Sequence, residues 1–477
     1  MDFSSITDSA RIAAGGIKDF AATLGHPTLR LGVTGLSRAG KTVFITALVH
    51  ALAKGARLPL FDAYAQGRIA RAYLEPQPDD DLPRFAYEDH LAALSGPNRH
   101  WPASTRSLSQ LRLTIDFTPV GLLARNFGSG FLHVDIIDYP GEWLLDLPLM
   151  EMSYAQWSAA TLAASRTPVR AHLAGEWHTF TATLDPFSRA DEGAAARSAT
   201  LFTAYLAQCR GRTVSLSMLP PGRFLMPGDL AGSPLLTFAP LDIAPYTEFQ
   251  RGSLGALMKR RYDSYVSKVV KPFFFGHFAR LDRQIVLVDA LAALNAGADA
   301  VKDLKDAMTS VLSCFRQGSN SWLSALFGRR VDRILFAATK ADLLHHTSHD
   351  RLEDILKLIV ADAVTRAEFL GAEIDVAALA AIRATREATV KRKGEELPCI
   401  AGIPEAGEAI GGEIFDGEAE AAAFPGDLPE DPAEALAGGL EGAVKFIRFR
   451  PPLLGDHGFP HIRLDRALEF LIGDRLE

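Results

Sequence analysis

The chain has 477 residues, of which 48% are hydrophobic and 22% charged, so it can bury a large core and is not a disordered tail. Its formal net charge is -7 and its Lys and Arg residues are scattered, which argues against a nucleic-acid backbone as the main partner. The sequence shows no secretory leader, no run of eighteen apolar residues and no paired cysteine spacing, so we expect a cytoplasmic protein without a disulfide framework or a zinc site.

The elements expected along the chain alternate between helix and strand. An amphipathic helix is expected within residues 1 to 24, and a buried strand at 29 to 34 is followed by a buried helix at 42 to 53. Further strands are expected at 111 to 117, 132 to 138, 284 to 288, 333 to 338 and roughly 376 to 382, with helices at about 298 to 315 and 349 to 371. Because most of these strands are continuous apolar runs, the pattern predicts an α/β fold around a mostly parallel sheet.

Two stretches depart from this alternation. Residues 144 to 282 are helical at first and punctuated by Pro and Gly later, which predicts a largely helical inserted subdomain. Residues 391 to 477 are expected to form a small C-terminal α+β segment, with a strand at VKFIRFR and a terminal helix from Asp465 as N-cap to Gly473 as C-cap. The remaining ranges, 25 to 143 and 283 to 390, are then expected to form the central nucleotide-binding domain.

The clearest motif is GLSRAGKT at residues 35 to 42, which fits the phosphate-binding pattern G-x-x-x-x-G-K-S/T between a strand and a helix. Gly35 and Gly40 let backbone N–H groups turn toward a phosphate, Lys41 supplies a positive charge, and Thr42 offers a hydroxyl to Mg²⁺. The residues expected to line the phosphate site are Gly35, Ser37, Arg38, Ala39, Gly40, Lys41, Thr42 and Val43.

A second phosphate-side element is predicted in FLHVDIIDYPGEW at residues 131 to 143. The apolar strand ends at Asp138, and Gly141 follows three residues later. In a P-loop protein a carboxylate at this strand end can hold Mg²⁺, and the glycine N–H can reach the γ-phosphate. We therefore assign Asp138 to the metal and Gly141 to the phosphate; the alternative is an ordinary turn at the end of a strand.

A base-recognition element is predicted in AATKADLL at residues 337 to 344. Lys340 and Asp342 follow another apolar strand. A lysine stem can cover a purine face, and a carboxylate accepts two hydrogen bonds from guanine N1 and N2, donors that adenine lacks. The pair favours GTP over ATP, and the alternative is a helix start with Asp342 near its N-cap.

The order GLSRAGKT, DYPG, TKAD and a last strand ending in IRAT resembles the motif set of the Ras-like GTPases. More narrowly, the chain resembles, over most of its length, the bacterial YcjX-like family of stress-associated GTP-binding proteins, including the segments FRPP and PHIRLDRALEFLIGDRL. The resemblance implies a Ras-like P-loop NTPase fold and a cytoplasmic protein that binds GTP or GDP with Mg²⁺ and hydrolyses GTP.

Three positions depart from the Ras-like pattern. Thr339 replaces the usual asparagine, which loosens one link between the base site and the phosphate loop. The sequence RAT replaces a Ser-Ala pair and leaves the backbone N–H of Ala384 as the expected contact to guanine O6. Glu142 stands where Ras-like proteins carry the glutamine that positions water, and its charge beside a phosphate favours slow turnover.

The resemblance also suggests catalytic roles for Lys41, Glu142 and two further residues. The phosphate loop resembles that of the guanylate-binding proteins, in which an arginine at the position of Arg38 serves as a finger in cis; the alternative is a solvent-facing arginine. Thr105 precedes a strand, as the Mg²⁺-binding threonine of the first switch does in Ras-like proteins. Ser104 and Ser107 are the alternatives to Thr105, together with the possibility that all three are plain surface hydroxyls.

The leading hypothesis is a GTPase switch in which GTP and Mg²⁺ order the segments around Thr105 and residues 138 to 143 and thereby signal to an unknown protein partner. The rivals are a P-loop ATPase and a stress scaffold that contacts partners or a membrane and turns over nucleotide incidentally. The aromatic and basic segments 268 to 280 and 321 to 330 are the candidates for peripheral membrane contact, although packing is the commoner explanation for such segments.

Overall fold

The computed structural model describes the chain from residue 27 to its last residue with short gaps. The described residues are 27–36, 38–103, 107–120, 130–211, 214–313, 331–369, 371–392, 395–410, 412–438, 440 and 446–477. The helix expected within residues 1 to 24, together with Ser37, Ser104, Thr105 and the segment 321 to 330, lies outside them.

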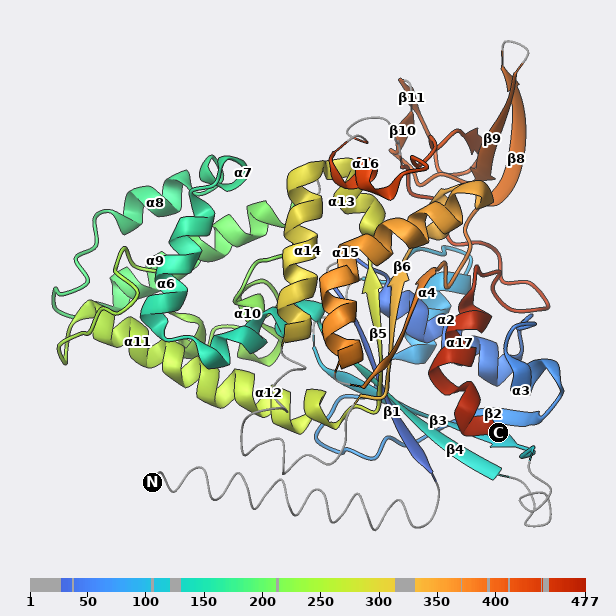
Figure 1. Ribbon diagram of the computed structural model, residues 1–477, viewed down its shortest axis with the longest axis horizontal. Coiled ribbons are helices and arrows are strands. Elements are labelled where there is room, and N and C mark those ends of the chain that lie inside the picture. The colour runs from blue at the N-terminus through green and yellow to red at the C-terminus, as the bar shows by residue number, and fades with distance from the viewer. Residues whose placement is uncertain are drawn as a thin grey trace.

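A seven-stranded sheet forms the centre of the molecule (Figure 1). Its strands are β1 (Thr28–Gly35), β2 (Ile69–Glu75), β3 (Ser109–Phe117), β4 (Gly130–Asp138), β5 (Arg283–Val288), β6 (Arg333–Ala338) and β7 (Glu373–Ala378). They lie in the order β2-β3-β4-β1-β5-β6-β7, with β3 antiparallel to both of its neighbours and β4, β1, β5, β6 and β7 parallel. The expected α/β fold with a mostly parallel sheet is confirmed.

The sheet differs from the sequence-based expectation at its two edges. β2 is an additional edge strand in which Ala72 is the one buried residue, so it lacks the continuous apolar run that identifies the inner strands. β7 ends at Ala378, although the apolar run from 376 to 382 predicted a longer strand. Beyond its end, Ala380 exchanges backbone hydrogen bonds with Ile462, so the apolar run is buried by the C-terminal segment instead of by the sheet.

Helices cover both faces of the sheet. Apolar side chains of α2 (Lys41–Lys54) and α17 (Leu464–Ile472) share one core with β1, β3 and β4. The opposite face of β5, β6 and β7 is covered by α13 (Ala290–Ala296), α14 (Ala298–Ser313) and α15 (His349–Phe369). The smaller elements of this domain are α3 (Asp62–Ala65), α4 (Tyr87–Ser95), η7 (Ala341–Leu343), η8 (His346–Ser348) and η9 (Gly473–Leu476).

A helical insertion lies between β4 and β5 and occupies the left of Figure 1. The 3₁₀ helix η1 (Gly141–Glu151) leads into it from the sheet. Its helices are α6 (Tyr154–Ser165), α7 (Pro168–Ala171), α8 (Gly175–Thr181), α9 (Glu192–Cys209), α10 (Gly222–Leu225), α11 (Leu254–Tyr265), the π-helical turn η4 (Val266–Val270) and α12 (Lys271–Gly276). Short 3₁₀ turns complete it at η2 (Gly228–Leu230), η3 (Pro234–Leu236) and η5 (Phe278–Arg280).

The insertion has its own aromatic core, in which the rings of Trp157 and Tyr262 stack with their centroids 5.3 Å apart. The aromatic residues of the segment 268 to 280 belong to this core, because Phe273 and Phe278 are buried within it. Packing therefore accounts for these aromatic residues, and membrane contact by the segment stays a prediction.

The residues after β7 first form a small β module at the upper right of Figure 1. It contains an antiparallel sheet of β8 (Arg386–Arg392), β9 (Glu395–Gly402) and β12 (Ala421–Ala423), the pair β10 (Ala409–Ile410) and β11 (Glu413–Ile414), and helix α16 (Pro432–Leu436). A division at residue 391 falls inside β8. The strand expected at VKFIRFR is not formed in its described part, where Phe449 makes only an isolated bridge with Pro404. Ile447 and Phe449 are buried against this module, and the backbone pairing stops after two hydrogen bonds with the segment that follows β9.

The C-terminal helix α17 returns to the central domain. It ends before Gly473 as expected, but it begins at Leu464 with Arg463 as its N-cap, so the expected N-cap Asp465 lies in its first turn. The Asp465 carboxylate instead accepts a hydrogen bond from the Leu60 N–H at 3.1 Å, which ties the helix to the segment after α2.

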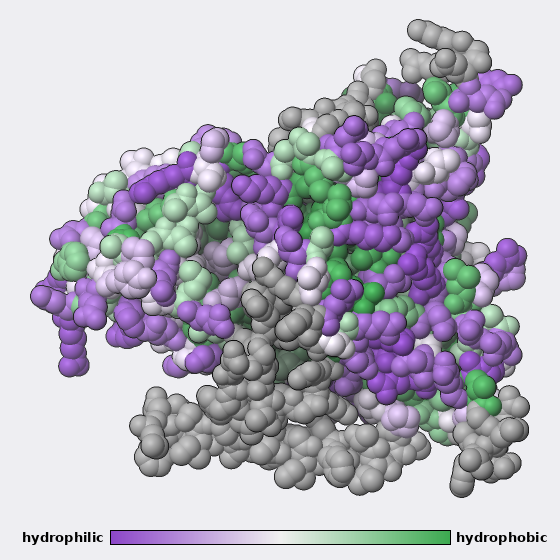
Figure 2. Space-filling model, viewed as in Figure 1, coloured by the Kyte–Doolittle hydropathy of each residue, from purple (hydrophilic) through white to green (hydrophobic). Residues whose placement is uncertain are grey.

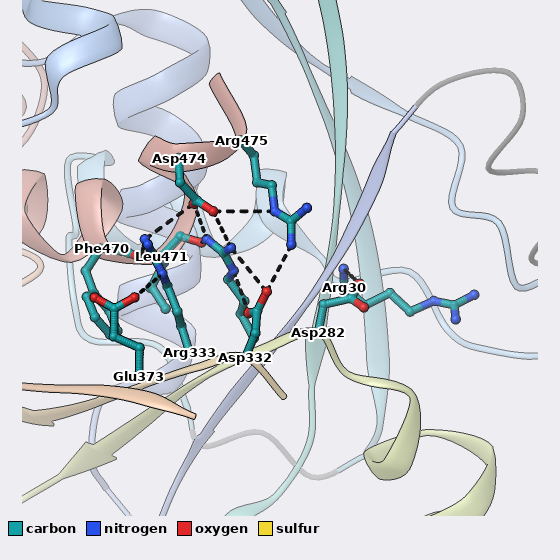
Figure 3. Close-up of polar contacts among 10 residues, drawn as sticks. Arg30, Asp282, Asp332, Arg333, Glu373, Phe470, Leu471, Asp474 and Arg475 are labelled. Carbon is teal, nitrogen blue, oxygen red and sulfur yellow. Dashed lines mark hydrogen bonds and ion pairs between the residues drawn. The ribbon is translucent and has the colours of Figure 1, made fainter. Parts of the chain in front are cut away.

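Figure 3 shows how acidic and basic side chains fasten the end of the chain to the sheet. Arg283, 1% exposed at the start of β5, donates to the Leu471 carbonyl oxygen at 2.8 Å and to Asp474 at 2.5 Å. Arg333 donates to the Phe470 carbonyl oxygen at 2.9 Å. The last helix is thus part of the central domain, held at the amino ends of β5 and β6.

Polar side chains predominate on the face seen in Figure 2, where apolar side chains gather mainly around α13. Among the helices of the described residues, none combines the length and the apolar character that crossing a bilayer requires.

Candidate nucleotide-binding site

The phosphate loop joins β1 to α2 at the carboxyl edge of the sheet. Gly40 caps the helix with φ 85°, a left-handed conformation that glycine adopts without strain. Gly35 lies so close to β5 that an added Cβ would stand 2.5 Å from the Leu287 carbonyl oxygen. Lys41 is 7% exposed, and its ammonium group donates to the Gly35 carbonyl oxygen at 2.8 Å. A phosphate bound at the start of α2 would therefore meet a loop that is already closed and an ammonium group held over it.

The register of the sheet places Asp138 and Gly141 beside this loop. Asp138 is 1% exposed at the end of β4 and pairs with Val33 of β1, two residues before Gly35. A Cβ added to Gly141 would stand 2.3 Å from the Gly35 carbonyl oxygen, so only glycine fits this contact. Such a close approach is what the Gly141 N–H needs in order to reach a terminal phosphate.

Two of the oxygen donors expected for Mg²⁺ lie on adjacent parts of this edge. Thr42 is buried in the first turn of α2, and Asp138 ends the strand beside β1. A hydroxyl and a carboxylate are the hard ligands that Mg²⁺ prefers, so the donor set fits this ion. Thr105 lies outside the described residues and stays a prediction. Ser109, four residues later in the chain, pairs with Asp138 across β3 and β4.

The loops that follow β5 and β6 meet at the same edge. The Thr339 N–H donates to the Val288 carbonyl oxygen at 2.9 Å, and the Lys340 ammonium forms an ion pair with Asp289. Lys340 has φ 62°, a backbone conformation that is uncommon for a residue with a side chain. The lysine expected to cover the base is thereby oriented by an aspartate from the neighbouring strand end.

The expected base contacts Asp342 and Ala384 lie together. Asp342 is 6% exposed, and its Oδ2 accepts a hydrogen bond from the Ala384 N–H at 2.9 Å. Burial raises the pKa of Asp342 to about 6, against the hydrogen bond from Ala384, which lowers it. The two groups assigned to guanine thus bond to each other, and a bound guanine would have to replace that bond.

Comparison with known proteins shows the family of the chain. Residues 29–476 match the model of the family described as "YcjX-like family, DUF463". The chain belongs to the YcjX-like family. It is 38% identical over 460 residues to the "Ras-like GTPase YcjX" of Escherichia coli (strain K12), which covers 94% of this chain and 96% of that protein. It is 35% identical over 476 residues to the protein of the same name from Shewanella oneidensis, with 94% and 95% covered.

In this YcjX-like protein Arg38 lies on the crest of the phosphate loop. It is exposed and has φ 66°, in the left-handed region that costs free energy for residues other than glycine. Backbone strain of this kind is concentrated at binding and catalytic sites. The role of Arg38 as a finger in cis stays a prediction.

Glu142 is the second residue of η1 and lies at the start of the insertion of this YcjX-like chain. The next residue is fixed firmly, because the Trp143 indole N–H donates to the Met226 carbonyl oxygen at 2.9 Å and the Arg223 guanidinium lies 3.2 Å from the centre of its ring. The segment after Gly141 is buried inside the insertion instead of forming a surface loop. A movement of this segment would therefore move the insertion as well.

Two residues of the site were absent from the sequence-based candidates. Asp289 follows the apolar run QIVLV just as Asp138 follows its strand, and this repeated strand-end aspartate was a usable signal. Arg210, at the end of α9, has its Nη1 3.6 Å from Glu142 Oε1. No local sequence pattern connects Arg210 with Glu142, because the two residues are far apart in the chain and meet only through the packing of the insertion.

Proposed function

We propose that this protein is a Mg²⁺-dependent GTPase switch that binds GTP and hydrolyses it to GDP and phosphate. The observation that carries the proposal is the meeting of three elements at one edge of the sheet: the phosphate loop, Gly141 packed on that loop, and the buried Asp342 beside Ala384. The names of the two relatives, both Ras-like GTPases, support a guanine nucleotide over an adenine nucleotide.

Each residue then has a defined task. The loop N–H groups and Lys41 would bind the β- and γ-phosphates, and the Gly141 N–H would contact the γ-phosphate. Thr42 and Asp138 would hold Mg²⁺, which when bound neutralises charge on the phosphates. Glu142 would orient the water that attacks the γ-phosphate. The reaction needs positioning and charge stabilisation more than covalent chemistry from the protein.

Guanine preference would rest on Asp342. Its carboxylate can accept hydrogen bonds from guanine N1 and N2, whereas adenine would leave a buried acceptor without donors. The aliphatic stem of Lys340, oriented by Asp289, would cover the face of the base.

A competition titration against a fluorescent GDP analogue tests this assignment. GTP and GDP should compete at least about 100-fold better than ATP, because a site built for hydrogen bonding rejects a base that lacks the donors. Asp342→Asn should lose this preference and gain affinity for xanthosine diphosphate, whose base carries a carbonyl oxygen where guanine carries an amino group. Equal competition by ATP and GTP in the wild type would favour a P-loop ATPase instead.

Lys41→Ala is the matched control for the phosphate side of the site. It should lower the affinity for every nucleotide by a similar factor, since Lys41 would contact the phosphates and not the base. The circular dichroism spectrum should stay that of the wild type. Unchanged affinity in a folded Lys41→Ala variant would remove the phosphate loop from the proposal.

A further inference from the structure

We propose that the insertion supplies Arg210 to the phosphate site, where its guanidinium is the counter-ion that allows Glu142 to work beside the γ-phosphate. The inference rests on the proposed function for the identity of the nucleotide. Arg210 is on this view a positioning residue that acts on the phosphate through Glu142.

Glu142 lies between the phosphate loop and the insertion, where two glycines allow close backbone contacts on either side of it. The preceding residue, Gly141, touches the loop, since a Cβ there would stand 2.3 Å from the Gly35 carbonyl oxygen. On its other side, the carbonyl oxygen of Glu142 would stand 1.9 Å from a Cβ on Gly222. Glu142 is 4% exposed, so both its position and its surroundings are set by packing.

The Glu142 carboxylate lacks the hydrogen bonds that a buried acid needs. Within the described part of the chain neither oxygen accepts a hydrogen bond, and its ion-pair partner is Arg210, with 3.6 Å between Arg210 Nη1 and Glu142 Oε1. The same Nη1 is buried and likewise has no hydrogen-bond acceptor among the described residues. Native proteins seldom leave buried polar groups unsatisfied, and the exceptions call for a ligand or a functional reason. A water molecule beside a bound phosphate would supply the missing donor.

Charge explains why a cation is needed here. A carboxylate next to the γ-phosphate repels it, and the repulsion is strong where water is excluded. An arginine in contact with the carboxylate cancels that charge and leaves the oxygens able to accept from water. Arg210 is suited to this task because it follows α9, whose buried face, including Phe202 and Leu206, anchors it in the core of the insertion.

The arrangement predicts an effect that depends on the number of phosphates. In Arg210→Ala the charge of Glu142 is no longer compensated. The affinity for a non-hydrolysable GTP analogue should therefore fall by about 10-fold relative to the affinity for GDP, because only the triphosphate reaches the carboxylate. Glu142→Gln is neutral and needs no counter-ion, so the double variant should regain the ratio of the Glu142→Gln protein. Arg210→Lys keeps the charge and should keep most of the wild-type ratio.

The experiment measures the affinities of GDP and the GTP analogue for all of these variants by the same titration. Arg197→Ala is the matched control, because Arg197 lies on the same helix but stacks over Phe180 on the outside, and it should leave the ratio unchanged. A purely structural role for Arg210 would weaken both nucleotides alike and would not be rescued by Glu142→Gln. If Arg210→Ala fails to bind GDP through misfolding, Arg210→Gln, which keeps the side-chain stem, takes its place with the same expected ratio.

An unchanged ratio in Arg210→Ala, or no rescue in the double variant, overturns the assignment. Because the affinities do not depend on turnover, the outcome is separate from that of the proposed function. Absence of hydrolysis by the wild type would contradict the proposed GTPase and leave a positive Arg210 result standing. Hydrolysis by the wild type with an unaltered affinity ratio in Arg210→Ala would support the proposed GTPase and overturn the role of Arg210.

Discussion

At the scale of single residues, the glycines of the site serve two different physical purposes. Gly35 and Gly141 lie in contacts where any side chain would collide with backbone, at 2.5 Å and 2.3 Å from the nearest carbonyl oxygens. Gly40 has open space around its missing Cβ but a left-handed backbone, so it is needed for conformation. Arg38, like Lys340, adopts a left-handed backbone without being glycine, so each of these two positions of the candidate site keeps its side chain at a cost in free energy.

The predicted role of the Arg38 side chain can be tested by replacing it with alanine. If its guanidinium meets charge that arises only in the transition state, Arg38→Ala should lower the rate of single-turnover GTP hydrolysis by at least about 10-fold and leave GTP affinity nearly unchanged. The rate should be measured at several protein concentrations, because an arginine on an exposed crest can need a second molecule to bring it into place. Wild-type rates in the variant at every concentration would make Arg38 a surface residue.

At the scale of elements, one buried carboxyl group ties η1 to the rest of the insertion. Asp146 accepts a hydrogen bond from the Gly222 N–H at 2.6 Å and another from the Tyr265 hydroxyl at 2.5 Å. These bonds join η1 to the start of α10 and the end of α11, both distant in the chain. The rigidity of the segment that follows Gly141 therefore depends on a side chain that is itself costly to ionise.

The cost of ionising Asp146 should make the free energy of unfolding depend on pH. Burial raises the pKa of Asp146 from 3.8 to about 6. The folded state then holds the proton more tightly than the unfolded state does. The protonated carboxyl group therefore stabilises the fold fully below pH 4, and this stabilisation is lost as the pH rises from 4 through 6. Relative to wild type, Asp146→Asn should gain about 1 kcal/mol in free energy of unfolding between pH 5 and pH 8, as measured by urea denaturation. Parallel pH profiles for the two proteins would show that Asp146 does not titrate in this way.

At the scale of the whole molecule, the two ends of the parallel strands have different tasks. The carboxyl ends carry the candidate site, and the amino ends of β5 and β6 hold the C-terminal helix through Arg283, Arg333 and Asp474. Although burial alone would raise it, hydrogen bonds from Arg283 hold the pKa of Asp474 below its usual range. The final residues of the chain are therefore part of the support of the sheet.

Removing the acid from this cluster should destabilise the whole protein. Asp474→Ala leaves the buried Arg283 short of a partner and should lower the free energy of unfolding by about 2 to 4 kcal/mol, less than a fully buried pair because Asp474 is itself 31% exposed. Thermal or urea unfolding measures this loss, and GDP affinity of the folded variant should stay unchanged. Glu420→Ala, which breaks the exposed pair with Arg386, is the control and should have little effect. A loss no larger than that of the control would contradict a supporting role for the C-terminal cluster.

The local and periodic features of this protein could be predicted from its sequence. The motif GLSRAGKT predicted a loop between a strand and a helix, and β1 and α2 are found on its two sides. Its binding of a phosphate stays a prediction. The inner strands β4, β5 and β6 were predictable as apolar runs, since strands covered on both faces have no polar side. The strand-end positions of Asp138 and Asp342 followed from these runs, whereas their roles stay predictions.

Contacts between segments that are distant in the chain could not be predicted in this way, because they depend on how the elements pack. The edge strand β2 and the segment VKFIRFR have sequences that suit more than one environment, and their neighbours determine whether they form a strand. The ion pair of Lys340 with Asp289 joins residues separated by two helices and a strand, and that of Arg210 with Glu142 joins residues separated by about half of the insertion. Local sequence carries no record of such contacts, because they depend on the faces that the sheet and the insertion bury against each other.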